Sequence, residues 1–92
     1  MLTYTLTRDQ FSALEGLSYW VADVAYMRER WGDNDPELTR ARATIENSFP
    51  MLDRLGVPFW VQNTVICWAE HWRNTKRQYL TDFLKSKNIF VA

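Results

Sequence analysis

The sequence predicts an all-α fold of three antiparallel helices, at about residues 8–31, 36–55 and 58–87, with short extended or irregular termini. Three observations lead to this prediction. Helix start and stop signals divide the chain at two places, apolar residues recur at helical spacing between them, and the connections are short enough to make neighbouring helices antiparallel. A chain of 92 residues has room for one core, so residues 1–92 are expected to form a single helical domain.

The first helix is predicted to begin at a capping box and to end at a glycine. In the stretch TRDQ, the Thr7 side chain can accept the backbone N–H of Gln10, while the Gln10 side chain reaches back to Thr7. Gly32 suits the far end of the helix. Between these signals, steps of three and four residues form an apolar seam at heptad spacing. This seam consists of Ala13, Leu17, Trp20, Val24, Met27 and Trp31.

The second helix is predicted from Asp35, a favourable N-cap, followed by Pro36 at the first helical position. Gly56 is expected to end it. Pro50 lies inside this span and lacks the amide hydrogen that a helix interior requires. We therefore expect a kink or a break near residues 46–50.

The third helix is predicted to open at Pro58 and to run to about Lys87, with Asn88 as a left-handed C-cap. Its apolar arc, like that of the first helix, is wider than a single neighbouring helix covers. Because this excess apolar surface needs a partner, we expect a homodimer with two-fold symmetry. The predicted dimer interface consists of Phe59, Ile66, Leu80 and Leu84.

Two short segments flank the predicted helices, LTYTL at residues 2–6 and the apolar IFVA at residues 89–92. In an up-down-up array of three helices they lie at opposite ends of one subunit. We therefore expect them to meet only across an antiparallel dimer, where each packs on the other chain.

Composition excludes several classes of protein. Hydrophobic residues make up 47% and charged residues 24%, which is typical of a folded chain rather than a disordered one. A single cysteine excludes an internal disulfide. The N-terminus lacks the basic and apolar regions of a signal peptide, and no apolar run approaches the roughly 20 residues that cross a membrane. The expected location is the cytoplasm.

Positive charge gathers near the C-terminus, where residues 71–92 contain five Lys and Arg residues against one Asp. Arg73, Lys76 and Arg77 are predicted to share one side of the third helix, which makes nucleic-acid binding an alternative function. Cations near a helix C-terminus also interact favourably with the helix dipole, and their long side chains cover apolar surface. We therefore expect these three residues to contact no phosphates.

Patterns for metal binding and catalysis are weak. Cys67 and His71 are four residues apart, as in half a zinc site or a thiolate–imidazole pair. The chain has no other Cys or His, so only a dimer could complete such a site, and we expect no metal and no cofactor. The stretch DNDPE at residues 33–37 lacks the glycine and the distant glutamate of an EF-hand. Without a nucleophile elbow or phosphate loop, the sequence predicts no enzyme.

Aromatic residues on otherwise polar helix faces favour a protein interface, because they combine rigid area with a hydrogen-bonding group. We expect partner contacts from Tyr19, Asp23, Tyr26, Trp60 and His71. The predicted function is a small non-enzymatic protein–protein interaction module that acts as a homodimer. Accessory and inhibitor proteins of mobile elements are of this kind. A small-ligand pocket rimmed by the same residues is an open alternative.

Overall fold

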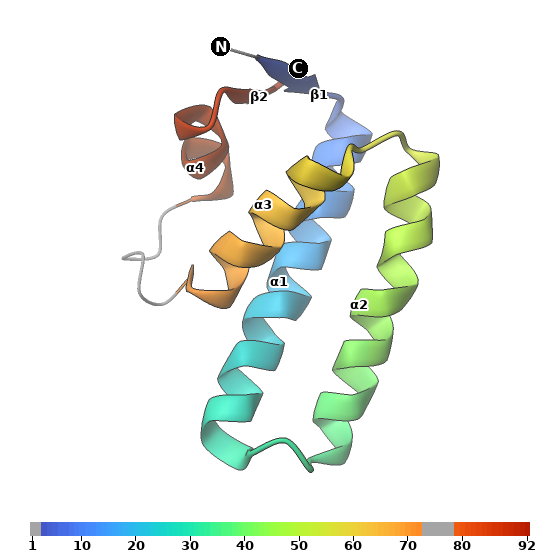
Figure 1. Cartoon of the computed structure of the whole chain (residues 1–92), viewed down its shortest axis with the longest axis vertical. Helices are drawn as coiled ribbons and strands as arrows, with labels where there is room; N and C mark the ends of the chain where they lie inside the picture. Colours follow the sequence, from blue (N-terminus) through green and yellow to red (C-terminus); the bar gives the residue numbers. More distant parts are fainter. Residues whose placement is uncertain (1–2, 73–78) are drawn as a thin grey trace.

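The computed structural model describes residues 3–72 and 79–92. Helices predominate, so the all-α class is confirmed at a coarse level, whereas the arrangement of three antiparallel helices is not (Figure 1). Helix α1 is central, because α2 and α3 both pack against it. In chain order the described elements are β1 (Tyr4–Leu6), α1 (Arg8–Trp31), α2 (Pro36–Arg54), α3 (Phe59–Glu70), α4 (Leu80–Ser86) and β2 (Ile89–Val91).

Helix α1 begins and ends as the sequence predicts. The Gln10 backbone N–H donates to Thr7 Oγ1 at 3.1 Å, and the Thr7 N–H donates to Gln10 Oε1 at 2.9 Å, which completes the capping box. The Gln10 side chain also donates to the Leu55 carbonyl at 2.8 Å, and so ties the start of α1 to the end of α2. At the other end, Gly32 has φ 79° and its N–H donates to the Arg28 carbonyl.

Gly16 inside α1 and Gly32 at its C-cap lead to opposite stability predictions. Gly16→Ala is expected to raise the free energy of unfolding by about 0.5–1 kcal/mol, because alanine restricts the unfolded chain. Nothing lies within 4 Å of the added Cβ at Gly16. Gly32→Ala is expected to lower stability by about 1–3 kcal/mol, since the backbone at φ 79° and ψ −179° is essentially restricted to glycine. Urea titrations followed by circular dichroism measure both changes, and changes of the same sign would contradict this assignment.

Helix α2 starts at the predicted cap, where the Glu37 N–H donates to Asp35 Oδ1 at 2.8 Å. It then continues through Pro50 to Arg54 as one helix, so of the predicted kink or break, the break is wrong and the kink stays a prediction. Proline leaves the Glu46 carbonyl without its helical N–H donor. Glu46 and Pro50 are both exposed, and water can satisfy this carbonyl in place of the missing donor.

The predicted third helix is not continuous. Helix α3 ends at Glu70, and α4 begins at Leu80. His71 ends α3 with φ −111° and ψ 15°, and Tyr79 precedes α4 with φ −66° and ψ 145°, so the backbone is not α-helical at either of these described positions. The prediction of one helix over residues 58–87 is therefore wrong.

The terminal segments pair with each other inside one chain, which the sequence did not predict. Strands β1 and β2 are parallel, with Tyr4 opposite Ile89 and Leu6 opposite Val91. The Tyr4 N–H donates to the Asn88 carbonyl at 2.9 Å, and Asn88 has the predicted left-handed conformation with φ 62°. The expectation that the termini lie at opposite ends of a subunit is wrong, and it no longer supports a dimer.

The hydrophobic core draws on all of these elements. Leu6, Leu84 and Ile89 are completely buried, so the two ends of the chain belong to the same core as the long helices. Gln62, only 3% exposed, donates to the Val57 carbonyl at 2.9 Å and to Asp53 Oδ1 at 3.0 Å. The Gln62 side chain thus donates hydrogen bonds to α2 and to the turn between α2 and α3, and holds the start of α3 in place relative to α2.

Candidate functional site

A groove runs between α1 and the end of α3. It consists of three cavities of about 330, 420 and 410 Å³, which we name the aromatic, middle and distal cavities. The aromatic and middle cavities share Ala22 and Trp72. The middle and distal cavities share Ala25, His71 and two carboxylates. Because neighbouring cavities share lining residues, they adjoin one another along α1.

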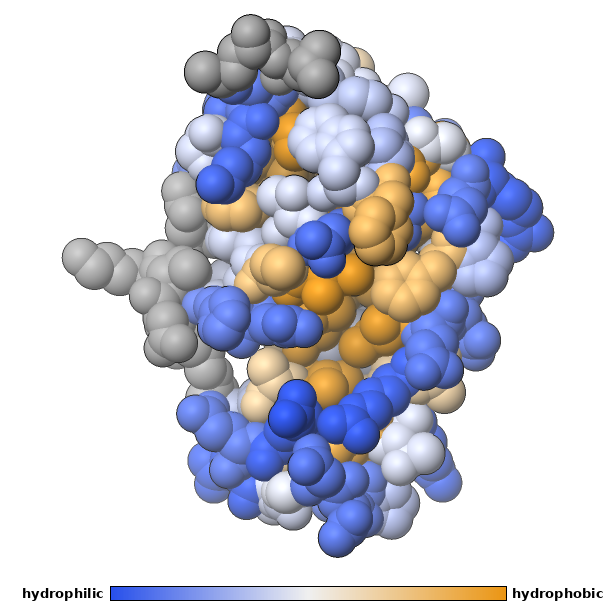
Figure 2. Space-filling view, viewed as in Figure 1, coloured by the Kyte–Doolittle hydropathy of each residue, from blue (hydrophilic) through white to orange (hydrophobic). Residues whose placement is uncertain are grey.

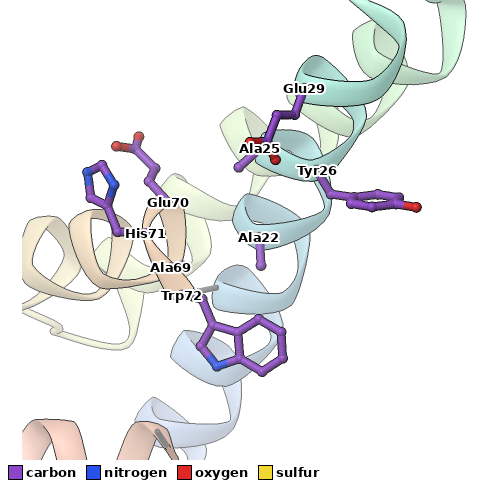
Figure 3. Close-up of a pocket in the computed structure, with 8 residues that line it drawn as sticks. All are labelled: Ala22, Ala25, Tyr26, Glu29, Ala69, Glu70, His71 and Trp72. Atoms are coloured by element: carbon purple, nitrogen blue, oxygen red, sulfur yellow. The ribbon is translucent and has the colours of Figure 1, made fainter. Parts of the chain in front are cut away.

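Small residues create the middle cavity, which Figure 3 shows in close-up. Ala22 and Ala25 are three positions apart in α1 and therefore share a face, with Ala69 of α3 contributing to the same cavity. The methyl side chains leave space that larger residues would fill. The Trp72 indole lies beside Ala22, and the Tyr26 ring extends away from His71 (Figure 3).

The aromatic cavity brings together α1, the end of α3 and the start of α4. Tyr19 is 64% exposed and Tyr79 is 78% exposed, whereas Trp68 is 8% exposed and stacks on Phe83 at 5.5 Å. The Trp68 indole nitrogen is buried and has no hydrogen-bond partner among the described residues. The complete lining is Glu15, Ser18, Tyr19, Ala22, Asp23, Trp68, Trp72, Tyr79 and Leu80.

The charged side chains in the described lining of the groove are mainly acidic. Arg28 is the basic side chain in this lining besides the His71 ring, and its Nε lies 3.1 Å from Asp33 Oδ1. Asp33 also pairs with Arg42 at 3.3 Å. This excess of carboxylates over basic side chains favours a positively charged ligand through electrostatic attraction. The carboxylates belong to Glu15, Asp23, Glu29, Asp33 and Glu70.

The structure brings together four of the five residues predicted to bind a partner. Tyr19, Asp23, Tyr26 and His71 all line the groove. Trp60 does not, because it packs edge-on against Tyr4 with ring centroids 6.0 Å apart. Their role in partner binding stays a prediction.

Sequence reasoning missed the other aromatic residues of the groove. Trp68, Trp72 and Tyr79 fall within the predicted third helix at residues 58–87 and were not among the residues predicted to bind a partner. Only the end of α3 at Glu70 and the separate start of α4 bring Tyr79 to the same cavity as Tyr19. No local pattern around Tyr79 could have indicated this.

The residues predicted for a dimer interface fall into two groups. Phe59 is 79% exposed, and Ile66 is partly buried against the core. Leu80 and Leu84 are 6% and 0% exposed, because α4 buries them in the chain's own core. The last two have no surface left for a second copy, so this part of the predicted interface is corrected.

The remaining predicted sites carry little structural information. Arg73, Lys76 and Arg77 lie outside the described residues. Cys67 is exposed on α3, and His71 is the exposed C-cap of that helix. Within residues 3–72 and 79–92, no three His, Cys, Asp or Glu side chains are grouped so that they could hold a metal ion. In the same part of the chain, no helix has both the length and the apolar character needed to span a membrane.

Comparison of the chain with protein-family models, curated proteins and solved structures gives no match.

Proposed function

We propose that the protein is a non-enzymatic interaction module that binds a segment of another protein along the groove. One observation carries this proposal: the exposed rings of Tyr19 and Tyr79 line the same cavity, next to Asp23. Tyrosine and tryptophan in a concave, partly desolvated site are typical of the residues that dominate binding energy at protein interfaces.

The length of the groove favours a polypeptide segment over a small molecule. Its lining follows α1 from Glu15 to Arg28, which corresponds to roughly 20 Å at 1.5 Å per residue. A helix of about 13 residues or an extended segment of about six residues spans this distance. A compact ligand would fill only one of the three cavities.

The test is an affinity pull-down from the native host with quantitative mass spectrometry. We expect one stoichiometric protein to be recovered by the wild-type chain, and recovery to fall at least about 10-fold with Tyr19→Ala combined with Tyr79→Ala. The matched control is Trp60→Ala, an aromatic residue that is 47% exposed and outside the groove lining. Equal losses in the two variants would contradict binding in the groove.

The same experiment distinguishes a protein partner from a nucleic acid. Recovery that is sensitive to nuclease and salt, and that the double tyrosine variant retains, would favour the alternative based on Arg73, Lys76 and Arg77. The acidic groove supports the protein partner instead, because its carboxylates repel phosphates.

A second surface supports self-association. Hydrophobic residues gather at the centre of one face, between α3 and α2 (Figure 2). Ile45 and Phe49 of α2 and Ile66 of α3 are partly buried hydrophobic residues, and Phe59 at the start of α3 is largely exposed. We propose that a second copy of the chain covers this face, since a two-fold axis brings the same apolar patch against itself.

A further inference from the structure

The aromatic cavity combines aromatic rings with carboxylates in a way that selects for a cation. Glu15, Tyr19 and Asp23 are spaced four residues apart in α1 and so share one helix face. Trp68, Trp72 and Tyr79 complete the aromatic part of the lining. Ring faces attract cations through their quadrupole, and the two carboxylates attract them directly.

The carboxylates of this cavity are not neutralised by the described part of the chain. Neither Glu15 nor Asp23 forms a salt bridge among the described residues, and no described Lys or Arg lines the cavity. A neutral apolar ligand would remove water from both carboxylates without replacing its hydrogen bonds. A cationic ligand interacts favourably with the aromatic rings and with the carboxylates at the same time.

The guanidinium group fits this lining better than an ammonium group. It is planar, it stacks on aromatic rings, and its fork of N–H donors matches a carboxylate. It is also less strongly hydrated than the lysine ammonium, so it loses less hydration free energy on entering a cavity lined by aromatic rings.

The indole N–H of Trp68 is a buried hydrogen-bond donor in a residue that lines this cavity. Trp68 lines the cavity, and its buried donor lacks an acceptor among the described residues. Buried donors are almost always paired. A peptide brings backbone carbonyl acceptors next to its side chain, and so offers this cavity both a cation and hydrogen-bond acceptors.

We infer that the aromatic cavity is the binding site for an arginine side chain presented by the partner segment. This inference rests on the proposed function and names the chemistry of the partner. The guanidinium stacks against the tyrosine rings and pairs with Asp23 and Glu15.

The test uses a minimal probe and the five tryptophan indole N–H signals of the ¹⁵N-labelled protein, assigned through Trp→Phe variants. The probe is N-acetyl-arginine N-methylamide, which contains the side chain and two peptide carbonyls. We expect saturable shifts of the Trp68 and Trp72 signals in the low-millimolar range, with the Trp60 signal unchanged. The lysine analogue is expected to bind at least about 3-fold more weakly. The neutral citrulline analogue is expected to bind at least about 10-fold more weakly.

A pair of matched variants locates the site. Asp23→Asn is expected to weaken binding of the arginine probe about 3–10-fold, because it removes one charge beside the guanidinium. Asp33→Asn, the same substitution in the distal cavity, is expected to change it less than about 2-fold. Added salt is expected to weaken binding to the wild type more than to Asp23→Asn.

Three results would overturn the inference: citrulline binding as tight as arginine binding, equal effects of the two aspartate variants, or no saturable shift of the Trp68 and Trp72 signals. If the probe fails while Tyr19→Ala with Tyr79→Ala still loses the protein partner, only the arginine assignment is wrong. If the probe binds while the double variant retains every partner, the proposed function of the groove is wrong instead.

Discussion

Replacing Leu84 by aspartate is expected to unfold the protein. Leu84 is completely buried in α4 and belongs to the main hydrophobic core. An unpaired carboxylate at this position costs several kcal/mol, against a total stability of about 5–15 kcal/mol for a domain. We expect the cooperative thermal transition seen by circular dichroism to be lost. The milder Leu84→Ala is expected to lower the free energy of unfolding by about 2–5 kcal/mol.

The matched control is Lys85→Asp, one position further along α4. Lys85 is exposed and lies in the last turn of α4, so this variant is expected to lower stability by no more than about 1–2 kcal/mol through the helix dipole, without loss of the cooperative transition. The comparison also shows whether Leu84 is a core residue of the chain or a contact between two copies of it. If Leu84 were a dimer contact, as the sequence predicted, Leu84→Asp would give a folded monomer of 11.0 kDa. Recovery of such a monomer with an unchanged urea midpoint would contradict the placement of α4 in the core.

Phe59→Glu is expected to separate the proposed homodimer into folded monomers. Phe59 is 79% exposed in the single chain, so a carboxylate there costs the monomer little. In a two-fold interface the same carboxylate loses its water and faces its own copy. We expect the dimer dissociation constant to rise at least about 30-fold, as for a hot-spot residue. Light scattering coupled to size exclusion at tens of micromolar measures the change.

Two further variants define the surface. Ile66→Glu is expected to separate the dimer and also to lower stability, because Ile66 packs partly against the core. Phe90→Glu places the same charge on the exposed side of β2 and is expected to leave the dimer intact. A wild-type chain that elutes as a monomer at these concentrations would contradict the homodimer, and the apolar face would then require a foreign partner.

Local signals in the sequence determined where the long helices begin and end. Thr7 and Gln10 form the predicted capping box, and Asp35 caps α2 as expected, because these hydrogen bonds join residues within three positions of each other. Helical periodicity also placed Tyr19 and Asp23 on one face of α1, and both line the groove. Interactions of this kind need only the local backbone, so the sequence alone predicts them.

Only the tertiary structure decided how the C-terminal third is arranged. The pairing of Tyr4 with Ile89 joins residues 85 positions apart, and strands of three residues are too short for alternation to reveal them. The same long-range packing buries Leu84 and brings Tyr79 to the cavity that Tyr19 also lines. An apolar residue has the same sequence signature in a chain's own core and in an interface, because both bury it. Only the folded chain shows which of these surfaces its own residues already cover.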